Sequence, residues 1–171
     1  EEAEIEAFNA MMQRRYDEGA DWLNYSADDW ADRNPFKAHL WWHCALFHLG
    51  RGDHVRALSM HDDLLRLVNS DSYVDVSNQT SLLKRLEMRG VDVGDRWDLL
   101  ADHAATRIED HILTFRDAHF CLALAAGGRT DIANDHLLSM AAFARDNDGW
   151  TADATGSTLI PLCEGIVAYE A

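Results

Sequence analysis

Basic residues and prolines are scarce in this chain of 171 residues. The sequence carries 15 Lys and Arg against 30 Asp and Glu, and only Lys37 and Lys84 are lysines, which gives a formal charge of −15. A surface this negative repels phosphate backbones and anionic lipid headgroups. We therefore expect neither nucleic acid nor a membrane among the partners, and interpret the acidity mainly as a means of solvation.

Long apolar runs and paired cysteines are missing as well. No run of about 18 apolar residues is present, and no charged segment followed by an apolar core indicates a secretory signal. The cysteines are Cys44, Cys121 and Cys163, an odd number without C-x-x-C spacing, and each stands among apolar residues. This pattern predicts buried thiols in a reducing compartment, so we expect a cytoplasmic protein.

What the chain does contain is helical periodicity. Strand-like alternation is absent, whereas apolar residues recur at spacings of three and four, which predicts an all-α fold. Pro35 and Pro161 both suit the first turn of a helix. About eight helices are expected, at 3–24, 34–50, 53–68, 73–89, 95–108, 115–126, 130–145 and 158–171. Short connections make neighbouring helices antiparallel hairpins, and no linker divides the chain, so we expect a single domain over 1–171.

The second and third expected helices have the spacing of a tetratricopeptide (TPR) hairpin. Trp41 takes the large first position of the hairpin pattern, Gly52 and Asp53 reverse the chain, and Asp53 suits the N-cap of the next helix. The small residues Ala45 and Ala57 allow the two helices to cross closely. A hairpin of this kind suggests helices stacked as an α-α superhelix.

The hairpin pattern returns 76 positions later in the sequence. Cys121 takes the first small position, Gly128 the turn and Ala133 the second small position. A third fit puts Gly165 at a small position and the following turn beyond Ala171. We therefore expect this chain to be a fragment of a longer protein.

Four blocks support a more specific resemblance. They read HLWWHCALFHLGRGDHVRAL, SLLKRLEMRGVDVGDRW, DHILTFRDAHF and LIPLCEG. In order and spacing they resemble the tetratricopeptide repeat protein 38 family, whose members are longer than this chain. The resemblance implies a TPR-like fold and no particular reaction. The chain departs from the family at Asn78, where the resemblance implies Asp, and at Arg116, where it implies Asn.

Histidines and nearby carboxylates form the first candidate site. His39 and His43 are four positions apart on one helix, a spacing that can present two imidazoles to a metal ion or small ligand. His111, Asp117 and His119 combine imidazoles with a carboxylate that could orient them. The sequence has no H-E-x-x-H motif, and these histidines are alternatively hydrogen-bonded residues at the edge of the core.

Trp42 forms the second candidate site, together with His39, Leu46 and Leu49. In TPR-like hairpins this stripe faces the concave groove, where an aromatic side chain could anchor a bound peptide. Packing beneath a neighbouring segment is the alternative. An acidic groove would attract a cationic, partly apolar segment.

No motif identifies an enzyme, and no cofactor is expected. The leading hypothesis is a non-catalytic scaffold that binds a peptide or protein partner on its concave face. The alternative is an enzyme or a metal- or ligand-binding protein that uses the His/Asp cluster. A homodimer formed through an uncovered face of the last helix is a third possibility.

Overall fold

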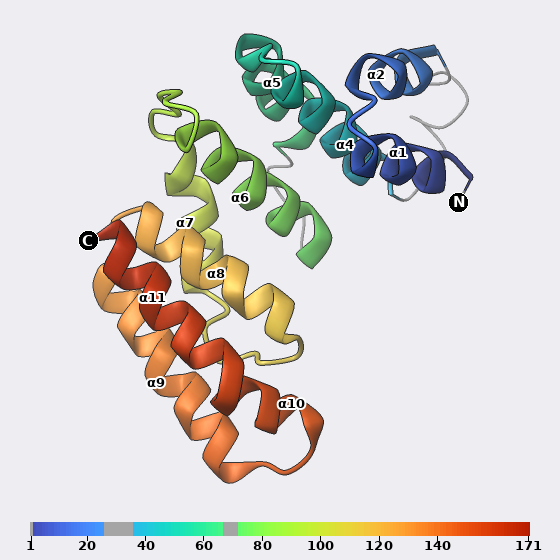
Figure 1. The fold of residues 1–171 in the computed structure, drawn as a ribbon. Helices are drawn as coiled ribbons and strands as arrows, with labels where there is room; N and C mark the ends of the chain where they lie inside the picture. The colour runs from blue at the N-terminus through green and yellow to red at the C-terminus, as the bar shows by residue number, and fades with distance from the viewer. Residues whose placement is uncertain (1, 26–35, 67–71) are drawn as a thin grey trace. The chain divides into compact units, whose positions relative to one another are not determined.

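The computed structural model describes residues 2–25, 36–66 and 72–171, and within these ranges the chain is helical without strands, which confirms the all-α prediction (Figure 1). Two compact units can be distinguished, residues 1–93 and 94–171. No helix in the described ranges has the length and apolar character needed to cross a membrane.

The first unit is built around α4. Its elements are α1 (Glu2–Met12), α2 (Tyr16–Tyr25), α4 (Lys37–Gly50), α5 (His54–Met60), a π-helical turn η1 (His61–Leu65) and α6 (Tyr73–Glu87). Helix α4 contacts α1, α2, α5, η1 and α6. Its side chains are buried almost all round, including Cys44, Ala45 and Phe47 at 0% exposure. The residues that the sequence assigns to a concave groove therefore lie on a helix that is surrounded by its neighbours. These residues are His39, Trp42, Leu46 and Leu49.

The expected helix 3–24 was wrong, because the chain reverses between α1 and α2. Arg14 adopts a left-handed backbone with φ 58°, and the amide of Arg15 donates to the carbonyl of Ala10 at 2.9 Å, which closes the end of α1. A continuous helix over this range would be about 33 Å long, far longer than α4. The reversal allows both α1 and α2 to pack on α4.

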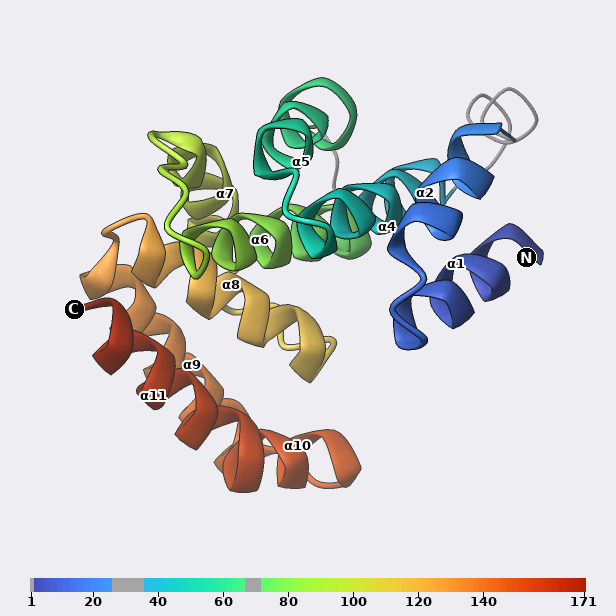
Figure 2. The same ribbon diagram turned by 45° about the horizontal axis from the view of Figure 1, so that its top comes forward.

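The second unit is built in the same way around α8. Its elements are α7 (Arg96–Ala105), α8 (Thr114–Ala126), α9 (Thr130–Asp146), α10 (Trp150–Ala154), a π-helical turn η2 (Thr155–Leu159) and α11 (Ile160–Glu170). Helix α8 contacts α7, α9, η2 and α11, and Figure 2 shows α9 and α11 side by side. The buried residues Cys121, Met140, Leu159 and Cys163 form the core between these helices.

The final helical segment begins at Trp150, eight residues before the expected start at 158. The run of Asp, Asn, Gly and Thr over 146–156 was predicted as a loop, yet Gly149 with φ 99° ends the turn and α10 follows directly. Pro161 stands in the first turn of α11, as expected. Because proline cannot donate to the carbonyl four residues back, the preceding π-turn lets the helix continue past it.

The predicted N-cap at Asp53 is confirmed. The side chain of Asp53 accepts a hydrogen bond from the amide of Arg56 at 3.2 Å, as a capping residue should. Asp95 occupies the N-cap of α7, but its side chain makes no capping hydrogen bond. The expected helix start at 34, with Pro35 in its first turn, and most of the expected connection between the helices 53–68 and 73–89 lie outside the described residues.

The two units repeat one another at the spacing seen in the sequence. A shift of 76 positions carries α4 onto α8, the start of α5 onto the start of α9, and most of α6 onto α10, η2 and the beginning of α11. The predicted small residues are all fully buried at the helix crossings: Ala45, Ala57, Cys121 and Ala133. The predicted small position Gly165 differs, because a β-carbon added there would meet nothing within 4 Å among the described residues.

Candidate functional site

The aromatic stripe of α4 is bonded to α6. Trp42 Nε1 donates to Ser81 Oγ at 3.0 Å, and His39 Nδ1 donates to Asn78 Oδ1 at 3.1 Å. The guanidinium carbon of Arg85 lies 5.9 Å from the centre of the Trp42 ring. His39 and Trp42, which the sequence assigns to a partner, thus contact the chain's own helix α6. Asn78 supplies an amide oxygen where the family resemblance implies a carboxylate.

His43 is enclosed beside this contact. It is 6% exposed, and its ring centre lies 4.6 Å from that of His39 and 5.0 Å from that of Trp42. Burial, with a smaller contribution from His39, lowers the pKa of His43 to about 4, so the ring is neutral at neutral pH. Within the described structure Nδ1 of His43 is buried without a hydrogen-bond partner. A neutral imidazole of this kind can accept a proton or a metal ion only if the site opens.

The remaining two residues of the predicted partner-binding stripe are buried, whereas His39 and Trp42 are half-buried. Leu46 is 9% exposed and Leu49 is 5% exposed. Both therefore contribute to the core of the first unit, and a partner could contact them only after a rearrangement.

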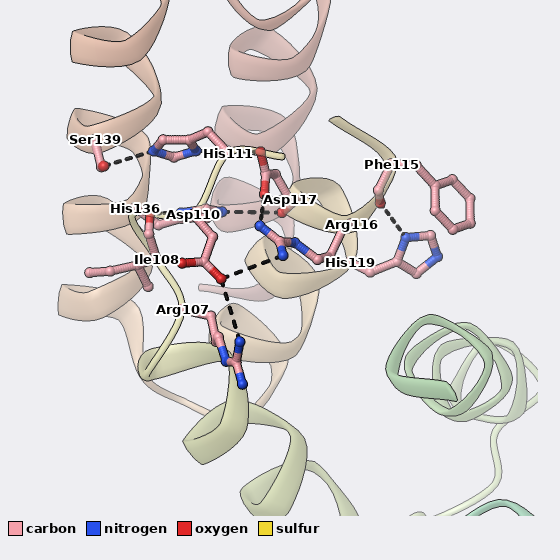
Figure 3. Close-up of polar contacts among 10 residues, drawn as sticks. All are labelled: Arg107, Ile108, Asp110, His111, Phe115, Arg116, Asp117, His119, His136 and Ser139. Carbon is pink, nitrogen blue, oxygen red and sulfur yellow. Dashed lines mark hydrogen bonds and ion pairs between the residues drawn. The ribbon is translucent and has the colours of Figure 1, made fainter. Parts of the chain in front are cut away.

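In the second unit, His111 links the connection before α8 to α9 (Figure 3). Its Nε2 lies 2.7 Å from Ser139 Oγ, and its Nδ1 lies 3.4 Å from Asp117 Oδ2. The order Ser, His, Asp is that of a nucleophilic triad. However, His111 is 6% exposed and Asp117 only 1% exposed, so the pair is closed to a substrate. We interpret the three residues as an anchor that holds His111 in its left-handed conformation, φ 34°.

A second histidine strengthens the same anchor. His136 is fully buried and stacks on His111, with ring centres 5.6 Å apart. Its Nδ1 lies 2.8 Å from the carbonyl oxygen of Ile108, and its Nε2 lies 3.3 Å from that of Asp117. Burial lowers the pKa of His136, so the neutral ring can donate to only one of the two carbonyls, and the shorter contact favours Ile108. These contacts tie the connection before α8 to α9.

Arg116 neutralises the buried carboxylate of this cluster. One guanidinium nitrogen lies 3.7 Å from Asp117 Oδ1, which is an ion-pair distance but too long for a hydrogen bond, and another lies 3.5 Å from Asp110 Oδ2. Arg107 approaches Asp110 at 3.7 Å from the other side (Figure 3). The arginine found where the resemblance implies Asn therefore serves as a counter-ion for Asp117.

His119 does not join His111 and Asp117. Its Nδ1 donates to the carbonyl oxygen of Phe115 at 2.7 Å, and Figure 3 shows its ring beside Phe115, directed away from the other two. His39 and His43 belong to the first unit. Across the residues that the structure describes, no group of three or more His, Cys, Asp or Glu side chains is arranged to hold a metal ion.

An open groove lies on the side of α8 that carries His119. Its volume is about 710 Å³. Three large apolar side chains on its walls are strongly exposed: Trp150 at 76%, Phe115 at 54% and Leu162 at 52%. The full lining comprises Thr114, Phe115, Ala118, His119, Trp150, Asp153, Ala154, Ser157, Thr158, Leu159 and Leu162.

Each wall of the groove is one face of a helix. Positions 114, 115, 118 and 119 repeat at helical spacing along α8, and positions 150, 153, 154, 157 and 158 repeat along α10 and η2. Asp153 contributes the one carboxylate of the lining, and within the described ranges no ion pair to it is formed. The groove can thus hold an apolar side chain while offering a negative charge to a cation.

The predicted stripe of α4 has its sequence counterpart on the groove-lining face of α8. His39, Trp42 and His43 shifted by 76 positions become Phe115, Ala118 and His119, which all line the groove. The opposite wall was missed because 146–156 was predicted as a loop. The spacing of Trp150, Ala154 and Ser157 was a helical signal available in the sequence.

Comparison with protein-family models and with solved structures does not assign this chain to a family. No protein-family model matches the chain, and no solved structure matches it. The candidate site therefore depends on its own geometry.

Proposed function

We propose that this protein is a TPR-like scaffold that binds a peptide or protein partner in the groove between α8 and the α10–η2–α11 segment. The observation that carries the proposal is the groove itself, with exposed Trp150, Phe115 and Leu162 on opposite walls. Exposed aromatic and aliphatic side chains around a concavity are typical anchors for a partner.

The repeated architecture supports the proposal. Each unit holds a central helix whose small residues allow a close antiparallel crossing with the next helix, as in TPR hairpins. We infer that the hairpins stack as an α-α superhelix, in agreement with the resemblance to the tetratricopeptide repeat protein 38 family. The groove then lies on the face of α8 that such repeats use for ligands.

The partner's chemistry follows from charge. The chain carries a formal charge of −15, and among the described residues no cation pairs with Asp153 in the groove. A cationic, partly apolar segment would gain an ion pair and bury the exposed rings, and its approach would be accelerated by the negative field.

A second copy of the chain is the alternative partner, and the exposed apolar side chains of α11 are the argument for it. Leu162 and Tyr169 of α11 are 52% and 73% exposed, so α11 presents apolar surface that a homodimer could cover. An enzymatic or metal-dependent role has less support, because His119 is separated from the His111–Asp117 pair. Light scattering at two concentrations distinguishes the homodimer from a monomeric scaffold.

Selection from a phage-displayed peptide library on the immobilised protein tests the scaffold function. We expect recovered peptides to bind the parent protein in fluorescence anisotropy and to lose at least about tenfold in affinity with Trp150→Ala, which removes a large anchor. Because Trp150 is 76% exposed, the variant should remain folded.

The matched control is Leu138→Ala, which truncates a side chain 70% exposed on α9 outside the groove lining. Its affinity should equal that of the parent. Failure to recover any peptide that depends on Trp150 would contradict the proposed function.

A further inference from the structure

The contact between α4 and α6 in the first unit corresponds in sequence to the two walls of the groove in the second unit. Shifting by 76 positions carries Trp42 to Ala118 and Ser81 to Ser157, and both counterparts line the groove. The same shift carries Arg85 to Pro161. The two contact regions therefore correspond, although they differ in what fills them.

In the first unit this region is filled by the chain itself. The Trp42 ring occupies the space between the helices, donates to Ser81, and lies beneath the guanidinium group of Arg85, whose carbon is 5.9 Å from the ring centre. Arg85 also donates to the carbonyl oxygen of Ser81 at 2.9 Å. The contact is thus an aromatic ring covered by an arginine.

In the second unit both of those groups are replaced. Ala118 lacks the ring and Pro161 lacks the cation, which leaves the space open. The aromatic surface is instead supplied by Trp150 and Phe115 on the two walls. Asp153 adds a carboxylate where the first unit has Ser77.

Trp150 and Asp153 are three positions apart on α10, and both line the groove. Residues at this spacing share one side of a helix, so a single cation can contact an aromatic ring and a carboxylate together. A planar guanidinium group suits such a position better than an ammonium group, because it stacks on a ring while its edge donates to a carboxylate.

Building on the proposed function, we propose that the groove recognises an arginine side chain of the partner, stacked on Trp150 and paired with Asp153. The partner's arginine takes the role that Arg85 takes within the first unit. Apolar neighbours of that arginine pack against Phe115 and Leu162.

The test uses the library-selected peptides. We expect groove-dependent peptides to be enriched in Arg flanked by apolar residues. Replacing that Arg by citrulline, which keeps the shape and removes the charge, should weaken binding to the parent protein about tenfold. Against Asp153→Asn, the difference between the Arg and citrulline peptides should shrink to about two- to fivefold, the part that the charge gains by stacking on Trp150.

The control variant is Asp148→Asn, which removes the same charge from an exposed residue outside the groove lining. It should preserve the full difference between the Arg and citrulline peptides. If peptides that depend on Trp150 lack Arg, or bind Asp153→Asn and the parent with the same Arg preference, the arginine site is wrong while the scaffold function stands. If no peptide depends on Trp150, both proposals fail.

Discussion

Trp42 and Ser81 join α4 to α6 through a hydrogen bond of 3.0 Å from the indole nitrogen to the hydroxyl oxygen. Ser81 also donates to the carbonyl oxygen of Asn78 at 3.1 Å, so its hydroxyl both accepts and donates. The ring of Trp42 is at the same time in contact with His39 and His43. The residue that the sequence offers as a partner's anchor is thereby engaged within its own unit.

The first prediction concerns this hydrogen bond. Trp42→Phe keeps an aromatic ring and removes the donor, so we expect the free energy of unfolding in urea to fall by about 1 kcal/mol. Adding Ser81→Ala should cost less in that variant than in the parent, with a coupling of about 0.5 to 1 kcal/mol. Trp150→Phe, on an exposed residue, should change stability by less than about 0.5 kcal/mol. Additive effects of Trp42→Phe and Ser81→Ala would contradict the contact.

The second prediction is a loss of stability in acid caused by His43. Its pKa is about 4 in the folded state, whereas an unperturbed histidine has a pKa of 6.5, so the unfolded chain takes up a proton first as the pH falls. The stabilisation by neutral His43 is present above pH 6.5 and is lost between pH 6.5 and 4, on the order of 3 kcal/mol at most.

His43→Phe should remove that part of the pH dependence, because phenylalanine does not titrate. The measurement is urea unfolding of parent and variant at several pH values from about 7.5 to 4.5, which span the titration of the unfolded histidine. The difference between their slopes isolates His43 from carboxylates and from other buried histidines such as His136. Parallel curves would show that His43 titrates normally in the folded protein.

The third prediction concerns two glycines with opposite surroundings. A β-carbon on Gly19 would lie 2.3 Å from Cζ of the fully buried Phe47, so Gly19→Ala should destabilise the protein by about 2 kcal/mol. A β-carbon on Gly165, within α11, meets nothing within 4 Å, and Gly165→Ala should stabilise by about 0.5 to 1 kcal/mol. Thermal unfolding measures both. Equal effects of the two substitutions would contradict the close packing of α2 on α4.

The fourth prediction concerns thiol reactivity. Cys44, Cys121 and Cys163 are free and 0% exposed. Burial raises the pKa of Cys44 to about 11, and a hydrogen bond with Cys121 together with burial raises the pKa of Cys163. We expect a chromogenic disulfide reagent at about pH 8 to label the native protein very slowly, and all three thiols to react at once in denaturant. Rapid labelling of the native chain would place a thiol at the surface.

The sequence was sufficient for the helical class, the small residues at the crossings and the burial of the cysteines. Local spacing determines these features: the positions of Ala45 and Ala57 already say which helix faces can approach closely. The break at Arg14 and the helix that begins at Trp150 were not predictable in the same way. Both depend on what the segment packs against, α4 in one case and α9 in the other.

The same distinction between local spacing and tertiary packing applies to the candidate site. The sequence by itself determined which residues share one stripe of α4 and of α8, because helical periodicity places His39, Trp42 and His43, and likewise Phe115 and His119, on one face. Only the tertiary structure decided that α6 covers this stripe in the first unit, whereas the second unit leaves it open. The physical reason is that a groove depends on the volume of side chains from a second helix, and local spacing carries no information about that helix.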